Sequence, residues 1–278
     1  MSELLPEQEK IIRLGFFLGV FALVALWELA APRRALTVPK AGRWAANLGL
    51  VALNTVLLRL LFPTAAVGLA LVGEEKGWGL IHYWDLNPWL AVVVGVVALD
   101  FAIYLQHVLF HAMPTLWRVH RMHHADLDYD VTTGARFHPM EVILSMGIKL
   151  GVVMGMGPAA VAVLIFEVLL NATALFNHGN LHLPEGIDRI VRLFVVTPDM
   201  HRVHHSIHAP LANSNFGFNL PWWDRLMGTY VAQPPEGHVA MAIGLKDCRD
   251  PKVANTLSGM LKLPFVRDSG EYTIHREG

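Results

Sequence analysis

Ten histidines stand in four short clusters whose spacing suits metal binding. Residues three or four apart lie on one face of a helix, so each cluster directs its imidazoles to one side. One metal ion rarely takes more than six ligands, so ten imidazoles indicate two metal ions. The single cysteine provides no thiolate site. The clusters HVLFH, HRMHH, HGNLH and HRVHH contain His107, His111, His120, His123, His124, His178, His182, His201, His204 and His205.

The composition is that of a membrane protein. Of 278 residues, 54% are hydrophobic and only 16% are charged, whereas soluble domains carry roughly 25% charged residues. The mean hydropathy is +0.41. This shortage of charge disfavours a soluble enzyme and indicates that lipid surrounds part of the protein. The net charge is −1 without a basic run, so nothing indicates nucleic acid as a partner.

Apolar runs predict four or five membrane helices. The first run covers residues 14–32, the second 44–73 and the third 88–111. A fourth stretch, 142–177, is too long for one crossing and is broken by GMGP, which predicts two helices folded as a hairpin. We therefore expect an all-α integral-membrane bundle with a histidine-rich helical cap that begins at His178.

We expect one membrane domain with three parts and a defined orientation. The parts are N-terminal membrane helices (1–87), a core (88–234) and a tail (235–278). The loop APRRALTVPKAGR carries four basic residues, whereas GEEKGWG has one lysine and two glutamates. The positive-inside rule places the first loop in the cytoplasm. The histidine clusters and the C-terminus then lie on the cytoplasmic face of an inner or cell membrane.

Polar residues inside the predicted spans share a face with the histidines. Asp100 and Tyr104 are in line with His107, and Glu167 and Asn171 are in line with His178. Carboxylates in a span usually face protein or water. They predict either support for the ligands or a proton path; the alternative is a structural ion pair, for example between Asp100 and Arg59.

Other polar residues flank the clusters. Asn177, Asn180 and Asp199 could bond to the ligands or cap helices. Thr197 fits the N-cap of the helix that bears the last triplet, with Pro198 at its first position. His138, in RFHP, is expected near the site but outside the ligand set, because the following proline disfavours a helical setting.

Arginines interleave with both histidine triplets. We expect Arg118, Arg121 and Arg202 to face lipid phosphate, an acidic partner or solvent. Their positions between the ligands therefore predict an exposed basic surface beside the site.

The order H-x3-H, H-x2-HH, H-x3-H, H-x2-HH resembles the fatty acid hydroxylase and sterol desaturase superfamily of integral-membrane oxygenases. The motifs RFHP (136–139) and NFGFNLPWWDRLMGTY (215–230) extend the resemblance over about residues 88–234. It implies a non-haem di-iron centre ligated by the ten histidines, with zinc able to replace iron on isolation. It also implies use of O2, a lipid substrate and an external ferredoxin- or cytochrome-like electron donor.

Several alternatives stay open. Hydroxylation of a fatty acyl, sterol, ether or amino-acid lipid and desaturation would use the same site. A bis-histidine haem electron carrier or a metal transporter would also place histidines on membrane helices. The sequence contains no H-E-x-x-H and no flavin or nicotinamide fingerprint, which favours oxygen chemistry with separately supplied electrons.

Overall fold

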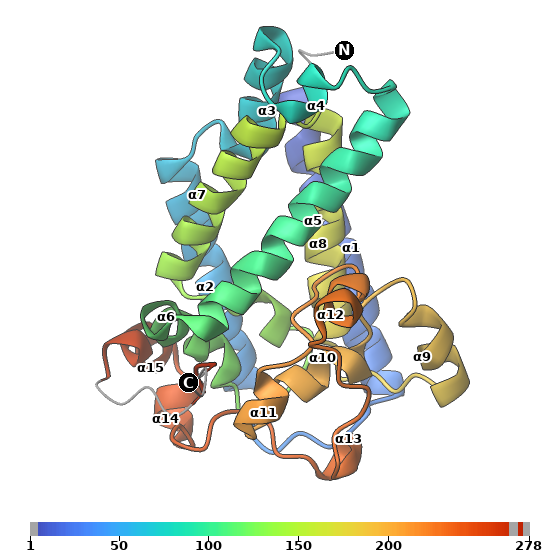
Figure 1. Cartoon of the computed structure of the whole chain (residues 1–278). Helices are drawn as coiled ribbons and strands as arrows, with labels where there is room; N and C mark the ends of the chain where they lie inside the picture. The colour runs from blue at the N-terminus through green and yellow to red at the C-terminus, as the bar shows by residue number, and fades with distance from the viewer. Residues whose placement is uncertain (1–4, 267–271, 275–278) are drawn as a thin grey trace.

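Long helices form one end of the molecule and short helices form the other (Figure 1). The computed structural model describes residues 5–266 and 272–274. In that part of the chain the regular structure is helical, with three isolated β-bridges and no strand. The prediction of an all-α membrane bundle with a histidine-rich cap is confirmed; the orientation of the cap stays a prediction.

Six helices build the long end, and α6, seven further short α-helices and the 3-10 helices η1 and η2 build the cap. The long-end helices are α1 (Leu5–Ala30), α2 (Lys40–Leu61), α3 (Ala65–Lys76), α5 (Pro88–Ala112), α7 (Pro139–Met156) and α8 (Ala160–Asn177), with the single turn α4 (Leu80–Tyr83) between two of them. The cap has α6 (Pro114–His124), η1 (Thr133–Ala135), α9 (Glu185–Val191), α10 (Pro198–His204), α11 (Ala209–Ala212), α12 (Trp222–Met227), α13 (Gly237–Ala240), α14 (Pro251–Ala254), α15 (Leu257–Lys262) and η2 (Leu263–Phe265). The second predicted run is thus split into α2 and α3, at Pro63.

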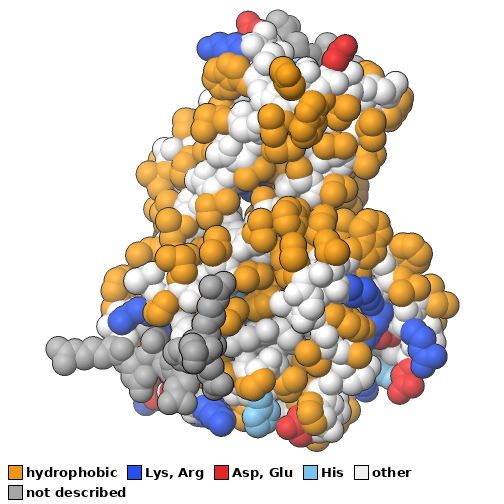
Figure 2. Space-filling model, viewed as in Figure 1, with side chains coloured by type: hydrophobic (Ala, Val, Ile, Leu, Met, Phe, Trp, Pro, Cys, Tyr) orange, Lys and Arg blue, Asp and Glu red, His pale blue; other side chains and the backbone are white. Residues whose placement is uncertain are grey.

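Five helical segments of the described chain are long and apolar enough to cross a membrane, in agreement with the predicted four or five. They are Gln8–Ala30, Lys40–Tyr83, Pro88–Ala112, Pro139–Met156 and Ala160–Asn177. Apolar side chains cover the visible face of this end, and charged ones gather near its two extremities (Figure 2). The protein is therefore an integral membrane protein.

The predicted hairpin is confirmed as α7 and α8. Helix α7 begins after the N-cap His138 and ends at Gly157, which has the left-handed φ of +63°. A Cβ on Gly157 would lie 1.7 Å from the carbonyl oxygen of Trp78. Only glycine allows both this backbone conformation and this close approach, so the break in the long apolar stretch also docks the α3–α4 connection.

A charged cluster is buried where α1, α7 and α8 meet. The carboxylate of Glu167 pairs with Lys149 at 2.6 Å and with Arg13 at 3.0 Å. Arg13 also pairs with Glu9 at 2.7 Å. Opposite charges in contact reduce the cost of placing ionised groups among apolar helices. The ion pairs of this cluster therefore link the three membrane helices α1, α7 and α8.

The loop after α6 is fastened to the start of α2 by buried aspartates. Asp126 accepts from Arg43 at 2.7 Å and from Asn255 at 2.8 Å. Asp130 also pairs with Arg43. Asp128 accepts from the backbone N–H groups of the chain before α2. Since Asp126 lies two residues after His124, this network fixes the end of the helix that carries the first histidine triplet.

We predict that Asp126→Ala destabilises the protein. The substitution leaves the buried Arg43 guanidinium without its 2.7 Å partner, and breaking a buried ion pair costs about 3–5 kcal/mol. Thermal unfolding in detergent should shift down by roughly 6 °C or more. Glu75→Ala, at an exposed position at the end of α3, is the matched control. Equal melting temperatures for the two variants would show that the network contributes little.

Candidate metal centre

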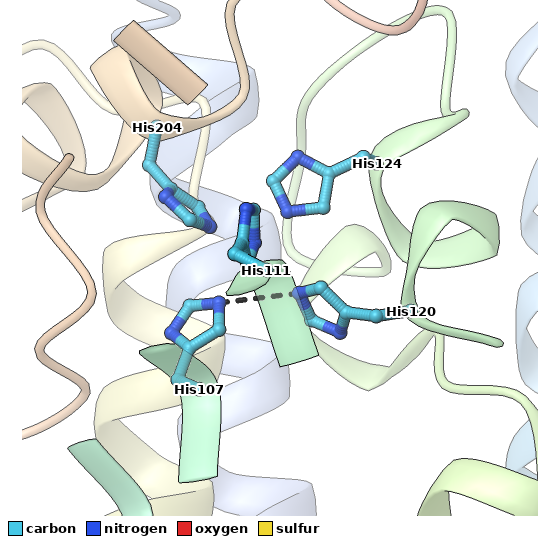
Figure 3. A group of neighbouring side chains, drawn as sticks. All are labelled: His107, His111, His120, His124 and His204. Atoms are coloured by element: carbon cyan, nitrogen blue, oxygen red, sulfur yellow. Dashed lines mark hydrogen bonds between the residues drawn. The ribbon is translucent and has the colours of Figure 1, made fainter. Parts of the chain in front are cut away.

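Nine of the ten predicted histidines gather into two buried groups. In each group, one nitrogen from every ring lies within 4.8 Å of the others. Figure 3 shows the rings of the first group converging on one region from α5, α6 and α10. The first group is His107, His111, His120, His124 and His204, and the second is His123, His178, His201 and His205.

The two triplets contribute to both groups. In HRMHH, His120 and His124 enter the first group and His123 enters the second. In HRVHH the division is reversed: His201 and His205 enter the second group and His204 the first. Residues four apart share a helix face, and the residue between them points to an adjacent sector. Each triplet therefore spans the two groups.

Local signals in the sequence place the helices that carry these rings. The side chain of Thr197 accepts from the Met200 N–H, and Pro198 occupies the first turn of α10. Both predictions for this helix are confirmed. Proline also opens α6, at Pro114 directly after Met113. Short connections at these prolines turn the chain so that α5 and α6 present their histidines to one another.

Burial favours the uncharged form of most of these rings. The nine side chains are between 0 and 3% exposed. Removal from water lowers the pKa of His123, His124, His201, His204 and His205 well below the usual value, and neighbouring histidines lower it further. Burial lowers the pKa of His178 to about 3. Neutral imidazole is the form that binds a metal, so these rings are ready as ligands at pH 7.

Six rings are oriented by an oxygen at Nδ1. His107 donates to the carbonyl of Phe216 at 2.7 Å, and His120 donates to the Glu141 carboxylate at 2.7 Å. His111, His123, His178 and His204 donate to Asn213 Oδ1 and to the carbonyls of Arg136, Ala174 and Ser214, at 2.7 to 3.0 Å. A proton on Nδ1 leaves the lone pair on Nε2. These six rings therefore have fixed tautomers and inward-facing lone pairs, the usual arrangement of metal-bound histidine.

The inward nitrogens approach one another closely. The Nε2 atoms of His107 and His120 are 3.2 Å apart, and those of His123 and His178 are 3.1 Å apart. Two lone pairs at this distance repel unless a cation lies between them. Nitrogens bound at 2.0–2.1 Å to one metal would be separated by roughly 2.9–3.4 Å. The donor set therefore fits metal ions, one for each group.

Several ring nitrogens also lack a hydrogen-bond partner in the described chain. They are Nε2 of His111 and His204, Nδ1 of His201, and both nitrogens of His124 and His205. Leaving a buried polar atom unpaired costs about 1–3 kcal/mol. Coordination would satisfy one nitrogen of each such ring, which is a second indication that the residues present suit bound metal.

The tenth predicted ligand, His182, lies outside both groups. Its side chain is exposed, while its neighbour Leu181 is fully buried in a bridge with Pro32. Alternate residues of an extended segment point in opposite directions, so burying Leu181 turns His182 outward. We therefore leave His182 out of the candidate ligand set.

Two polar residues of α5, Asp100 and Tyr104, form hydrogen bonds with residues other than the histidines. Asp100 accepts from Trp223 Nε1 at 2.7 Å, and Arg59, its alternative partner, is exposed. Tyr104 bonds to Thr229 at 3.0 Å and approaches the histidines only through the ring of Phe216.

Two polar residues of α8, Glu167 and Asn171, also contact other parts of the protein. Glu167 belongs to the ion cluster with Arg13 and Lys149, and Asn171 donates to the Glu167 carbonyl of its own helix at 2.7 Å. Glu167 precedes His178 by eleven residues, about 16 Å along a helix. These two residues are thus placed in the membrane bundle and not beside the rings.

The residues flanking the clusters position backbone and arginines. Asn177 donates to the carbonyl of Phe218 at 3.0 Å, and Asn180 donates to the carbonyl of Arg34 at 2.8 Å. Asp199 pairs with arginines and with His238 at 3.5 Å. His138 is the N-cap of α7, with its Nδ1 accepting from Met140 N–H. His138 is therefore placed as a cap, as the proline after it indicated.

The expectation of exposed arginines beside the triplets is wrong for two of them. Arg121 is 2% exposed and pairs with Asp247 at 3.5 Å; Arg202 is fully buried and pairs with Asp199. Arg118 is half-buried and donates to the carbonyl of Pro264. The cap folds over the triplets, so the faces between the ligands meet protein and not solvent.

Sequence reasoning missed the two side chains that orient rings of the first group, Glu141 and Asn213. Glu141 stands in the first turn of α7, three residues after His138, where an acid is also expected for helix stability. Asn213 follows the short helix α11. Neither position has a spacing that relates it to a ligand cluster, because both contacts join segments distant in sequence.

Sequence comparison relates the segment that carries these histidines to known proteins. The profile of the fatty acid hydroxylase family matches residues 92–229. An ornithine lipid hydroxylase (OlsE) of Rhizobium tropici is 28% identical over 199 residues, 70% of this chain and 57% of that protein. The alkylglycerol monooxygenase of Homo sapiens is 27% identical over 157 residues, 54% of this chain and 32% of that protein.

The chain thus spans little more than half the length of the first of these relatives and a third of the second. No solved structure gives a significant match. The matched segment contains all nine gathered histidines. Through residues 92–229, the protein belongs to the fatty acid hydroxylase family.

Proposed function

We propose that the protein is a membrane-bound, non-haem di-iron oxygenase that hydroxylates a C–H bond of a lipid, using O2 and electrons from a separate ferredoxin- or cytochrome-like donor. The observation that carries the proposal is the pair of buried histidine groups with inward-facing lone pairs. The printed activities of the relatives, on ornithine lipid and alkylglycerol, support a lipid substrate.

The first group would hold one iron through five imidazoles and the second would hold the other through four. Iron bound there would supply redox chemistry toward O2. The protein's own contribution is orientation: carbonyls and the Glu141 carboxylate hold the Nδ1 protons, so each Nε2 remains available. The nine buried rings also make a site that water enters poorly, since their side chains are at most 3% exposed.

The arrangement disfavours a haem carrier. A haem takes two axial ligands on opposite faces of a porphyrin, so the remaining rings would have no place. Here five and four rings converge within 4.8 Å, which leaves no space for a macrocycle. Desaturation would use the same two groups and is distinguished from hydroxylation by its product.

The first prediction for this site is metal stoichiometry. Wild-type protein loaded anaerobically with iron should hold about two metals per chain. His124→Ala in the first group and His205→Ala in the second should each lower metal content and abolish turnover, because one missing imidazole opens the coordination sphere. Elemental analysis measures the content, and zinc at the same stoichiometry would also support the site.

His182→Ala is the matched control for these variants. It removes the imidazole of an exposed histidine that belongs to one of the four histidine clusters, so metal content and turnover should be unchanged. A wild-type protein with one metal or none, or a His182→Ala variant with metal loss equal to His124→Ala, contradicts the proposed centre.

The reaction itself is tested by lipid extracts from cells with and without the gene. Hydroxylation predicts a lipid heavier by one oxygen atom, whereas desaturation predicts a lipid lighter by two hydrogens; mass spectrometry separates the two. Cells that express His120→Ala serve as the control for protein insertion without a complete site. If wild-type and His120→Ala extracts are identical under aerobic growth, lipid oxidation in these cells is excluded.

We further propose that the cap lies on the cytoplasmic face. The support is the basic loop between α1 and α2, which carries Arg33, Arg34, Lys40 and Arg43. A reporter fused after Gly278 should behave as internal, because the cap follows the last membrane helix. A reporter that reads from the opposite side would reverse the orientation and the side on which the electron donor binds.

A further inference from the structure

The candidate centre is closed to the bilayer. All nine rings are at most 3% exposed, although the proposed substrate is a lipid in the membrane. The shallow apolar groove of about 390 Å³ on the outer face of α1, lined by Ile11, Gly15 and Phe16 among others, belongs to a different part of the surface. A lipid tail therefore reaches the rings only when some covering element moves.

One segment, which is irregular as far as Pro221 and continues into the start of α12, contacts both the histidines and two membrane helices. This segment, residues 216–223, is called the strap here. The ring of Phe216 lies 5.5 Å from that of His107 and 5.1 Å from that of His111. The ring of Phe218 lies 5.1 Å from His107 and 5.9 Å from His201. The strap thus covers both histidine groups with aromatic side chains.

The strap is fastened to α5 and α8 by several polar contacts. Trp223 donates to Asp100 of α5 at 2.7 Å, and Asp100 lies seven residues, about 10 Å along the helix, from His107 toward the middle of the span. On α8, Thr173 bonds to Asn219, and Asn177 donates to the carbonyl of Phe218 at 3.0 Å. The strap therefore bridges α5 and α8 beside the rings.

The strap differs from the other covers of the site in carrying none of the nine histidines. Helices α6 and α10 bear the ligands, so displacing either would dismantle both groups. Within the strap, the carbonyl of Phe216 is held by His107 and the N–H of Gly217 by Asp224 at 2.9 Å. These contacts fix its first two residues and leave Phe218 to Trp223 as the part that can move without disturbing a ligand.

The outer side of the strap is suited to lipid. Trp222 is 48% exposed and Leu226 is 72% exposed, and the neighbouring Phe194 is 59% exposed. Trp222 donates to the carbonyl of Leu193 at 2.6 Å, which joins these side chains into one apolar surface. Indole rings with one polar bond and one apolar face are typical of the membrane interface.

We propose that residues Phe218–Trp223 form a gate through which the acyl or alkyl chain of a bilayer lipid enters between α5 and α8, with Asp100–Trp223 and Thr173–Asn219 as its latches. This proposal rests on the proposed function of the histidine groups. Release of the latches exposes the aromatic lining of the strap to the incoming chain, and closure excludes water from the rings.

A reversible lock tests the gate. Thr173→Cys and Asn219→Cys are combined in a Cys248→Ala background, which removes the chain's one native thiol. Diamide should join the two cysteines and hold the strap on α8. Lipid turnover should then fall at least tenfold and return with dithiothreitol, while metal content stays constant. Each single-cysteine variant in the same background is the control and should be insensitive to diamide.

A second variant tests the other latch without a crosslink. Trp223→Phe keeps an aromatic ring but removes the N–H that Asp100 accepts. Hydrogen–deuterium exchange of residues 218–223 should rise while exchange of α6 and α10 is unchanged. Because a larger open fraction raises apparent affinity, KM for lipid should fall by about 2- to 10-fold. Trp222→Phe, which alters the exposed neighbouring indole, should leave strap exchange at the wild-type level.

The outcomes separate the gate from the centre. Full turnover by the oxidised, crosslinked protein overturns the gate, as does strap exchange in Trp223→Phe equal to that of wild type. A reduced protein that holds two metals per chain but oxidises no lipid overturns the proposed function and the gate with it. Loss of turnover in the locked state, with two metals retained and activity restored by reduction, supports the gate.

Discussion

The structure depends on keeping nine imidazoles together in a dry interior. A buried cluster of this kind is unfavourable alone, because inward lone pairs face each other at 3.1 to 3.2 Å. The protein holds the arrangement by giving six Nδ1 protons an oxygen acceptor, mostly a backbone carbonyl. Carbonyls at the ends of short helices and in loops are available for such bonds, which explains why the cap consists of many short helices.

Charged groups stabilise the frame around these neutral rings. The network of Arg43 with Asp126 and Asp130 fixes the chain after the first triplet, and Arg202 with Asp199 fixes the helix of the second. Ion pairs that are buried in this way tolerate little displacement, because separating them leaves an unpaired charge. The rings can therefore stay in place when a neighbouring segment such as the strap moves.

The long helices and the nine gathered histidines could be predicted because each depends on local pattern. Apolar length marked the spans, GMGP marked the hairpin, and Thr197 with Pro198 marked the start of α10. His182 lies outside both groups because its direction is set by the bridge between its neighbour Leu181 and Pro32, which are 149 positions apart along the chain. The roles of Glu141 and Asn213 could not be predicted for the same reason. Each orients a histidine ring through a contact between segments that are distant in the sequence.

The division of each histidine triplet between the two groups has a consequence for assembly. A helical turn that supplies both groups cannot be completed for one group and left unformed for the other. Helices α6 and α10 must therefore both be folded before either group has its full set of rings. The two halves of the centre therefore form one cooperative unit of folding. One half cannot form its full set of ligands while the other half is still disordered.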